Sequence, residues 1–243
     1  MKWKIAALLL LAALPGVVAT SWIALPLLVE ASQNLVPLRT LQIATAIQST
    51  VLVLIAALIG ASLAPRVGLA APVITAIASS GGVIDAMRPQ LVPGLVGGAI
   101  GAAVILGFSA FAPEFLMAIQ PERPLPLVVR VLYGGITEEV LIRWGLMTAM
   151  VWAGWKVLNR DLQQPSSGVM WTAIAVSALA FGVSHLPSVA QSLPTLSVSV
   201  VAYITIGNAL FGLVAGYLFW RYGLEAAMVA HASAHVLAFA IRG

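Results

Sequence analysis

Cysteine is absent from this sequence of 243 residues. Its absence excludes disulfide bonds, thiolate metal sites and cysteine nucleophiles, and it leaves the redox compartment unreadable. The chain also has no internal repeat, no low-complexity tract and no long polar linker. Any catalytic or binding chemistry must therefore use residues other than cysteine, and short loops must connect the secondary-structure elements that carry them.

Charge is nearly as scarce. Only 8% of the residues are charged and 61% are hydrophobic, whereas soluble domains carry about 25% charged residues. The mean hydropathy is +1.04, and so short a chain could not cover an apolar core of that size with polar surface. A soluble globular protein is therefore excluded. The net charge of +4 is typical of basic residues in cytoplasmic loops, so it predicts no nucleic-acid partner.

Apolar runs are what the sequence has instead. Six of them reach or approach the roughly 20 residues needed to cross hydrocarbon. They are Ile5–Val29, Leu41–Leu63, Val92–Ala112, Val169–Leu186, Val198–Trp220 and the shorter Ala226–Ile241. A seventh, from about Val131 to Val157, contains charged residues; an eighth candidate, Val67–Ile84, is weakened by Pro72 and a Ser-Ser-Gly-Gly run. The sequence predicts an all-α fold, a polytopic transmembrane bundle of seven or eight helices.

We expect one integral membrane domain over residues 1–243. Residues 1–120 hold no histidine and no acidic residue deep in a run, which favours scaffold helices, whereas residues 125–243 hold the polar motifs. The start, Met1-Lys-Trp-Lys4, also resembles a signal peptide. Because the apolar run continues to Val29, we expect a first membrane helix instead.

Glu138 and Glu139 stand side by side in the text Y-G-G-I-T-E-E-V-L-I-R, inside the seventh run. An ionisable group at bilayer depth costs roughly 2.5–3.5 kcal/mol, so such residues indicate function by default. Arg143 lies four residues after Glu139, on the same face of an α-helix and in the favourable order. We therefore expect Arg143 to hold Glu139, leaving Glu138 as a freer carboxylate suited to a general base. The alternative is a buried network that only pairs helices.

All three histidines lie in the last two fifths of the chain. His185 ends the text F-G-V-S-H before Leu186-Pro187, where a helix is expected to stop. His231 and His235 are four apart and share a helix face. A lone histidine at a helix end is often a cap, and a histidine pair can be a packing contact. If the three helices converge, the glutamates and histidines together could activate water and stabilise an oxyanion.

The order E-E-x-x-x-R, F-x-x-x-H and H-x-x-x-H resembles the CAAX protease and bacteriocin-processing (Abi) family, from about Leu125 to Gly243. The residues that carry it are Glu138, Glu139, Arg143, Phe181, His185, His231 and His235. The resemblance implies a polytopic intramembrane protease of glutamate type without a cofactor. It implies that Glu138 is the base, that His185 helps it to deprotonate water, that Arg143 and Glu139 support it, and that His231 and His235 stabilise the oxyanion.

One position departs from the family pattern, since His235 stands where asparagine is usual. A neutral imidazole donates one hydrogen bond, as an amide can, but it is also a metal ligand. A zinc-dependent protease is thus the nearest alternative, with His185, His231, His235 and Glu138 as ligands and water completing the site. Against it, the chain lacks the glutamate that the H-E-x-x-H signature places after the first histidine.

Other classes fit less well. Ser184 and His185 are adjacent and point about 100° apart on a helix, so they cannot form a serine dyad. Asp85 and Asp161 lie outside the convincing runs, which excludes an aspartyl protease. A non-enzymatic transporter or immunity protein stays open, because membrane-embedded Glu, His and Arg also suit proton relays. We expect a multi-pass protein of the plasma membrane, whose partners are the bilayer and a membrane-associated peptide or protein, with a prenylated substrate as one candidate.

Overall fold

The computed structural model describes residues 1–29, 36–113, 125–158, 161–190 and 195–242, and these contain helices but no strand. The first part comprises α1 (Lys2–Ala19), η1 (Thr20–Ala24), α2 (Leu25–Val29), α3 (Leu38–Leu63), η2 (Ala64–Arg66), α4 (Pro72–Ser79) and α5 (Val83–Ala110). The second part comprises α7 (Leu127–Val129), η3 (Arg130–Glu138), η4 (Val140–Met147), α8 (Thr148–Leu158), α9 (Ser167–Val183), α10 (Leu186–Ala190), α11 (Val198–Arg221) and α12 (Leu224–Arg242). The all-α prediction is confirmed. The proposed boundary near residue 120 lies outside the described residues.

Six of the described helical segments are long and apolar enough to cross a membrane. They are Lys2–Val29, Leu38–Arg66, Val83–Ala110, Ser167–Ala190, Val198–Arg221 and Leu224–Arg242. Each contains most or all of one of the six runs expected from the sequence. The seventh run, Val131–Val157, is helical but is not among these spans, because it carries Glu138, Glu139 and Arg143 close together.

The candidate for an eighth helix does not form a span. Within Val67–Ile84 the structure has only the eight-residue α4, which begins at Pro72 and ends where Ser80 turns to a φ of 55°. Buried polar groups fix α4 in place. The Glu225 carboxylate at the start of α12 accepts a hydrogen bond from the Ile74 backbone N–H of α4 (2.9 Å). Next to it, the Gln90 side chain of α5 accepts one from the Ala226 backbone N–H (3.0 Å), which joins α5 to α12.

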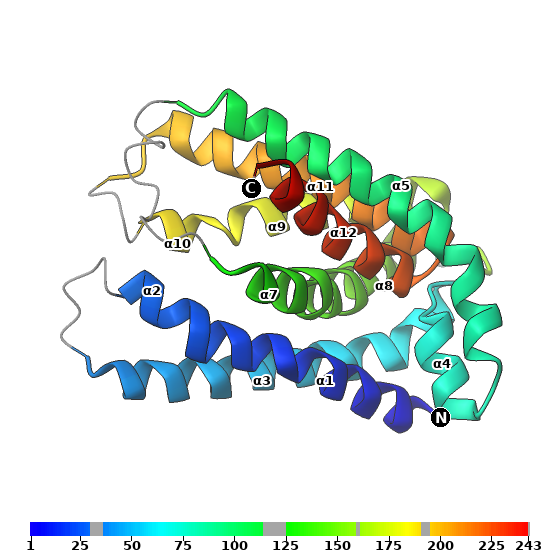
Figure 1. Ribbon diagram of the computed structural model, residues 1–243. Helices are drawn as coiled ribbons and strands as arrows, with labels where there is room; N and C mark the ends of the chain where they lie inside the picture. Colours follow the sequence, from blue (N-terminus) through cyan, green and yellow to red (C-terminus); the bar gives the residue numbers. More distant parts are fainter. Residues whose placement is uncertain (30–35, 114–124, 159–160, 191–194, 243) are drawn as a thin grey trace.

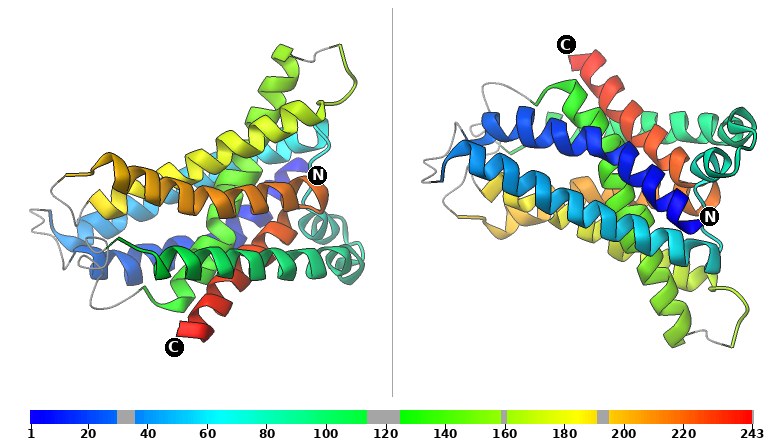
Figure 2. Two further views of the ribbon diagram at one scale, coloured as in Figure 1. Left: turned by 90° about the horizontal axis from the view of Figure 1, so that it is seen from above. Right: turned by 90° about the horizontal axis from the view of Figure 1, so that it is seen from below.

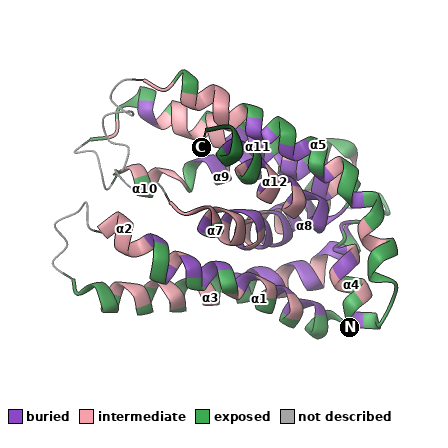
Figure 3. Ribbon diagram, in the orientation of Figure 1, coloured by how far each residue is buried: buried purple, intermediate pink, exposed green. Residues whose placement is uncertain are grey.

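The helix that bears the glutamate pair lies in the middle of the molecule. In Figure 1 the ribbon from α7 to α8 is seen nearly end-on, whereas α1, α3, α5 and α11 run across the picture. One side of this helix packs on the pair α1–α3, and the other side packs on α12, α9 and α11. The two views of Figure 2 also show it crossing the long helices. Figure 3 shows the middle of this helix, residues 130–151, as a mixture of buried and intermediate residues with none exposed.

Residues Arg130–Glu138 and Val140–Met147 form π-helix, where the sequence predicts an α-helix. Two hydroxyls follow the wider register: Thr137 lies 3.4 Å from the Leu132 carbonyl, and Thr148 lies 3.3 Å from that of Arg143. A π turn closes i to i+5 and holds more residues than an α turn. Positions four apart, such as 134 and 138, therefore lie nearer to one line along the helix. π-helical turns occur frequently at functional sites.

Close contacts seat this helix against the first two spans. The Thr137 hydroxyl donates to the Ala13 carbonyl of α1 (2.9 Å), beside Gly16, where a Cβ would collide with Thr137 and Leu132. The Trp144 indole N–H of η4 donates to the Ala57 carbonyl of α3 at 3.3 Å. Bonds of this kind, buried in an apolar surrounding, hold a backbone in one register.

A stripe of small residues brings α12 close to α5. A Cβ added at Gly98 would overlap the Ser233 hydroxyl, and one at Gly94 would lie 3.0 Å from the Ala226 carbonyl. Small residues let membrane helices approach each other closely. This contact fixes the helix that carries His231 and His235.

Candidate active site

The glutamates and Arg143 differ in exposure. The side chain of Glu139 is fully buried and that of Arg143 is 1% exposed, whereas that of Glu138 is 20% exposed. Arg143 Nε lies 3.3 Å from Glu139 Oε2, which is the pair that the spacing predicts. It is an ion pair without hydrogen-bond alignment. Arg143 Nη2 donates to the Gly212 carbonyl of α11 at 3.3 Å.

His231 joins both glutamates. Its Nδ1 lies 2.8 Å from Glu139 Oε1, and its Nε2 lies 3.9 Å from Glu138 Oε2. Glu139 therefore has two partners, Arg143 and His231, although its spacing in the sequence indicates only the first. Because an ionised carboxylate can only accept, the Nδ1 of His231 carries a proton in this contact. The orientation of the ring follows from that bond.

His235 stacks on His231, with the ring centroids 5.1 Å apart and an interplanar angle of 26°. The backbone of Gly134 lies opposite both rings. A Cβ at Gly134 would lie 3.1 Å from His235 Nε2 and 3.3 Å from His231 Nε2. The two Nε2 atoms therefore face the same part of η3, one turn before Glu138.

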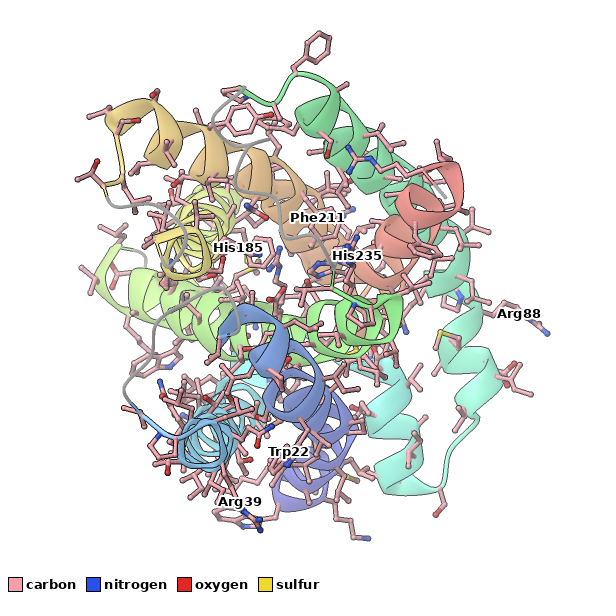
Figure 4. The ribbon with its side chains drawn as sticks, turned by 60° about the vertical axis from the view of Figure 1, so that its left-hand side comes forward. Trp22, Arg39, Arg88, His185, Phe211 and His235 are labelled. Atoms are coloured by element: carbon pink, nitrogen blue, oxygen red, sulfur yellow. The ribbon has the colours of Figure 1, made fainter. Side chains whose placement is uncertain are left out.

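His185 joins the cluster through Phe181. The Phe181 ring lies 4.7 Å from the His185 ring and 5.8 Å from the His231 ring, and Arg143 Cζ lies 4.8 Å from it. His185 Nδ1 lies 2.8 Å from the Phe181 carbonyl, which can only accept, so this nitrogen carries the proton and Nε2 of neutral His185 keeps its lone pair. Figure 4 labels His185, His235 and Phe211 in the interior between the helices.

The structure thus gathers Glu138, Glu139, Arg143 and His231 in direct contacts, with His235 stacked beside them. His185 contacts Phe181 rather than a glutamate among the described interactions. A buried charge is stable only when it is paired and hydrogen-bonded. In this cluster Glu139 meets that requirement through Arg143 and His231.

The ligands expected for the zinc alternative are not grouped around one point among the described residues. No group of three or more His, Asp and Glu side chains within the described ranges is placed to hold a metal ion. One nitrogen of His231 already lies against Glu139.

Two residues of the site gave no signal in the sequence. Phe211 of α11 lies 4.6 Å from the His231 ring, centroid to centroid, but it is one apolar residue in a long apolar run. Gly134 is one of 21 glycines, and only the fold brings it against the imidazoles. In the sequence, only the spacing of four residues between Gly134 and Glu138 distinguishes it from the other glycines.

An all-helical, multi-pass membrane protein with ionisable side chains buried at the centre of its bundle is the class that fold and site define. Residues 120–237 match the family model described as type II CAAX prenyl endopeptidase, Rce1-like. The match covers just under half of the chain, and over these residues it confirms the resemblance found in the sequence. The comparison with curated proteins gave no match, and neither did the comparison with solved structures.

Proposed function

We propose that this protein is an intramembrane endopeptidase of glutamate type, which hydrolyses a peptide bond with a water molecule activated by Glu138. The observation that carries the proposal is that the two adjacent carboxylates differ in burial and in partners. Glu139 is fully buried between Arg143 and His231, whereas Glu138 is partly exposed and lies 3.9 Å from His231 Nε2. One carboxylate orients the site and the other is free to take a proton.

In the proposed reaction Glu138 accepts a proton from the attacking water, and the hydroxide adds to the carbonyl carbon of the scissile bond. His185 assists, because its unprotonated Nε2 can accept a hydrogen bond from the same water. The proton on Glu138 then passes to the leaving amine as the carbon–nitrogen bond breaks. Every proton is accounted for without a co-reactant.

His231 and His235 stabilise the negative oxygen of the tetrahedral intermediate. With Nδ1 donating to Glu139, His231 can donate from Nε2 only when both of its ring nitrogens carry a proton. His235 donates from its own Nε2 in the neutral form. Donors prearranged for such an oxygen are worth about 10²–10³-fold in rate each.

The proposed substrate is a membrane-associated peptide or protein, and a prenylated CAAX protein is the first candidate because the family description names prenyl endopeptidases. We place the protein in the plasma membrane. No metal takes part in the proposed mechanism. Purified protein should therefore keep its activity after dialysis against a chelator, and a loss that zinc restores would favour the zinc-dependent alternative.

The proposal is tested with wild type and variants in proteoliposomes, using internally quenched CAAX peptides with and without a prenyl group and mass spectrometry of the products. We expect Glu138→Gln to reduce kcat about 10²–10⁴-fold, the usual contribution of a general base. Asp161→Asn is the matched control, since it neutralises an exposed carboxylate in a loop. Cleavage by Glu138→Gln at the wild-type rate would exclude Glu138 as the base, and a wild type that cleaves none of the peptides would favour a transporter or immunity protein.

A further inference from the structure

We infer that Gly134 is a positioning residue, whose missing side chain keeps open the space in front of His231 Nε2 and His235 Nε2 where the carbonyl oxygen of the scissile peptide bond must lie. This inference rests on the proposed function. It adds a backbone wall to a site otherwise built from side chains.

The backbone does not explain a glycine at this position. Gly134 lies within η3 and is not among the described glycines with a positive φ, which are Gly68 and Gly223. In a helix glycine is about 1 kcal/mol less favourable than alanine. A residue with a side chain could adopt this conformation at lower cost, so the reason for glycine lies in its surroundings.

The neighbouring glycine shows the difference. A Cβ at Gly135 would lie 2.9 Å from the Ala232 Cβ and 3.1 Å from its Cα, so Gly135 allows η3 to pack against α12. A Cβ at Gly134 would instead meet two ring nitrogens, His235 Nε2 at 3.1 Å and His231 Nε2 at 3.3 Å. Gly135 thus faces the backbone and methyl group of Ala232, whereas Gly134 faces two imidazole rings.

Among the described contacts, neither of those nitrogens makes a hydrogen bond. His231 uses its Nδ1 for Glu139, so only its Nε2 is available to a substrate, and that atom also lies 3.9 Å from Glu138 Oε2. Position 134 lies one turn before Glu138 on the same helix, nearly in line with it because of the π register. The base, the two donors and Gly134 thus lie together in the site, and a methyl group at position 134 would press against both Nε2 atoms.

The test compares wild type, Gly134→Ala and a matched control in proteoliposomes, with the CAAX peptide that the wild type cleaves. The control is Gly154→Ala in α8, whose added Cβ would lie at the same 3.1 Å from a side-chain atom, Val169 Cγ1, outside the site. We expect Gly134→Ala to lower kcat about tenfold or more with little change in KM, because an oxyanion donor acts only in the transition state. Gly154→Ala should keep the wild-type kcat.

A double variant distinguishes blocking of His235 Nε2 by the methyl group from an unrelated disturbance of the fold. If the methyl group acts at His235 Nε2, Gly134→Ala adds little to the loss caused by His235→Ala, whereas independent damage would multiply the two losses. Wild-type kcat in Gly134→Ala, a change confined to KM, or multiplied losses would each overturn the inference. So would a Gly134→Ala variant that fails to fold beside a folded Gly154→Ala, because Gly134 would then serve packing. A wild type that cleaves no peptide overturns the proposed function, and this inference with it.

Discussion

Removing one partner of the buried Glu139–Arg143 pair should destabilise the protein far more than removing both. The two side chains are 0% and 1% exposed, with 3.3 Å between Nε and Oε2. Deleting one member of a buried pair typically costs about 3–5 kcal/mol, whereas replacing the whole pair by apolar residues of similar size is often nearly neutral. Methionine matches the length of both side chains and removes their charge.

The two single variants should differ from each other. In Arg143→Met, Glu139 keeps His231 Nδ1 at 2.8 Å, so its charge still has a partner. In Glu139→Met, Arg143 keeps the Gly212 carbonyl at 3.3 Å and the Phe181 ring at 4.8 Å, but it loses the carboxylate that balances its charge. We expect about 3–5 kcal/mol for Glu139→Met and less for Arg143→Met.

The assay is thermal unfolding of wild type, both single variants and the double variant in one detergent. At about 2–4 °C per kcal/mol for a chain of this size, Glu139→Met should lower Tm by about 6–20 °C. The double variant should lie above Glu139→Met. If the two single losses add within about 0.5 kcal/mol, as independent sites do, the pair is not coupled and the reasoning fails.

Two further predictions concern α12. His235→Asn, which installs the residue usual in the family, should keep kcat within about tenfold of wild type. His235→Ala should lower kcat about 10²–10³-fold, as expected for an oxyanion donor. Equal kcat values in wild type and both variants would show that His235 takes no part in the reaction. Gly98→Val should displace α12 from α5, because its Cβ would overlap Ser233, and it should lower both Tm and the rate of peptide cleavage. Gly107→Ala in the same helix is the control: no atom lies within 4 Å of its Cβ, so it should leave both unchanged.

The membrane spans were predictable because long apolar runs have few alternatives to a helix in lipid. The Glu139–Arg143 pair was predictable for a similar reason, since positions four apart share a helix face. Hydropathy does not encode the hydrogen-bond register, so the π-helix of η3 and η4 could not be read from the sequence. The apolar run Val67–Ile84 is only a weakened candidate in the sequence, and in the structure the same features, Pro72 and the turn at Ser80, leave room for only eight helical residues.

The contact between Glu139 and His231 could not be predicted from the sequence for another reason. The two residues are 92 positions apart, and only the packing of α12 against η3 brings them together. Phe211 and Gly134 depend on the same packing. Local patterns thus identified the ionisable residues, whereas their partners followed from tertiary contacts.

The bond from Thr137 to Ala13, with that from Trp144 to Ala57, has a consequence for how the protein can be divided. The helix that bears both glutamates lies within the family match at residues 120–237, but its partners in these bonds belong to α1 and α3, outside that match. The family segment is therefore not a portable module. Grafted onto another membrane anchor or expressed alone, it would carry every motif residue and yet lack the surface that sets their register.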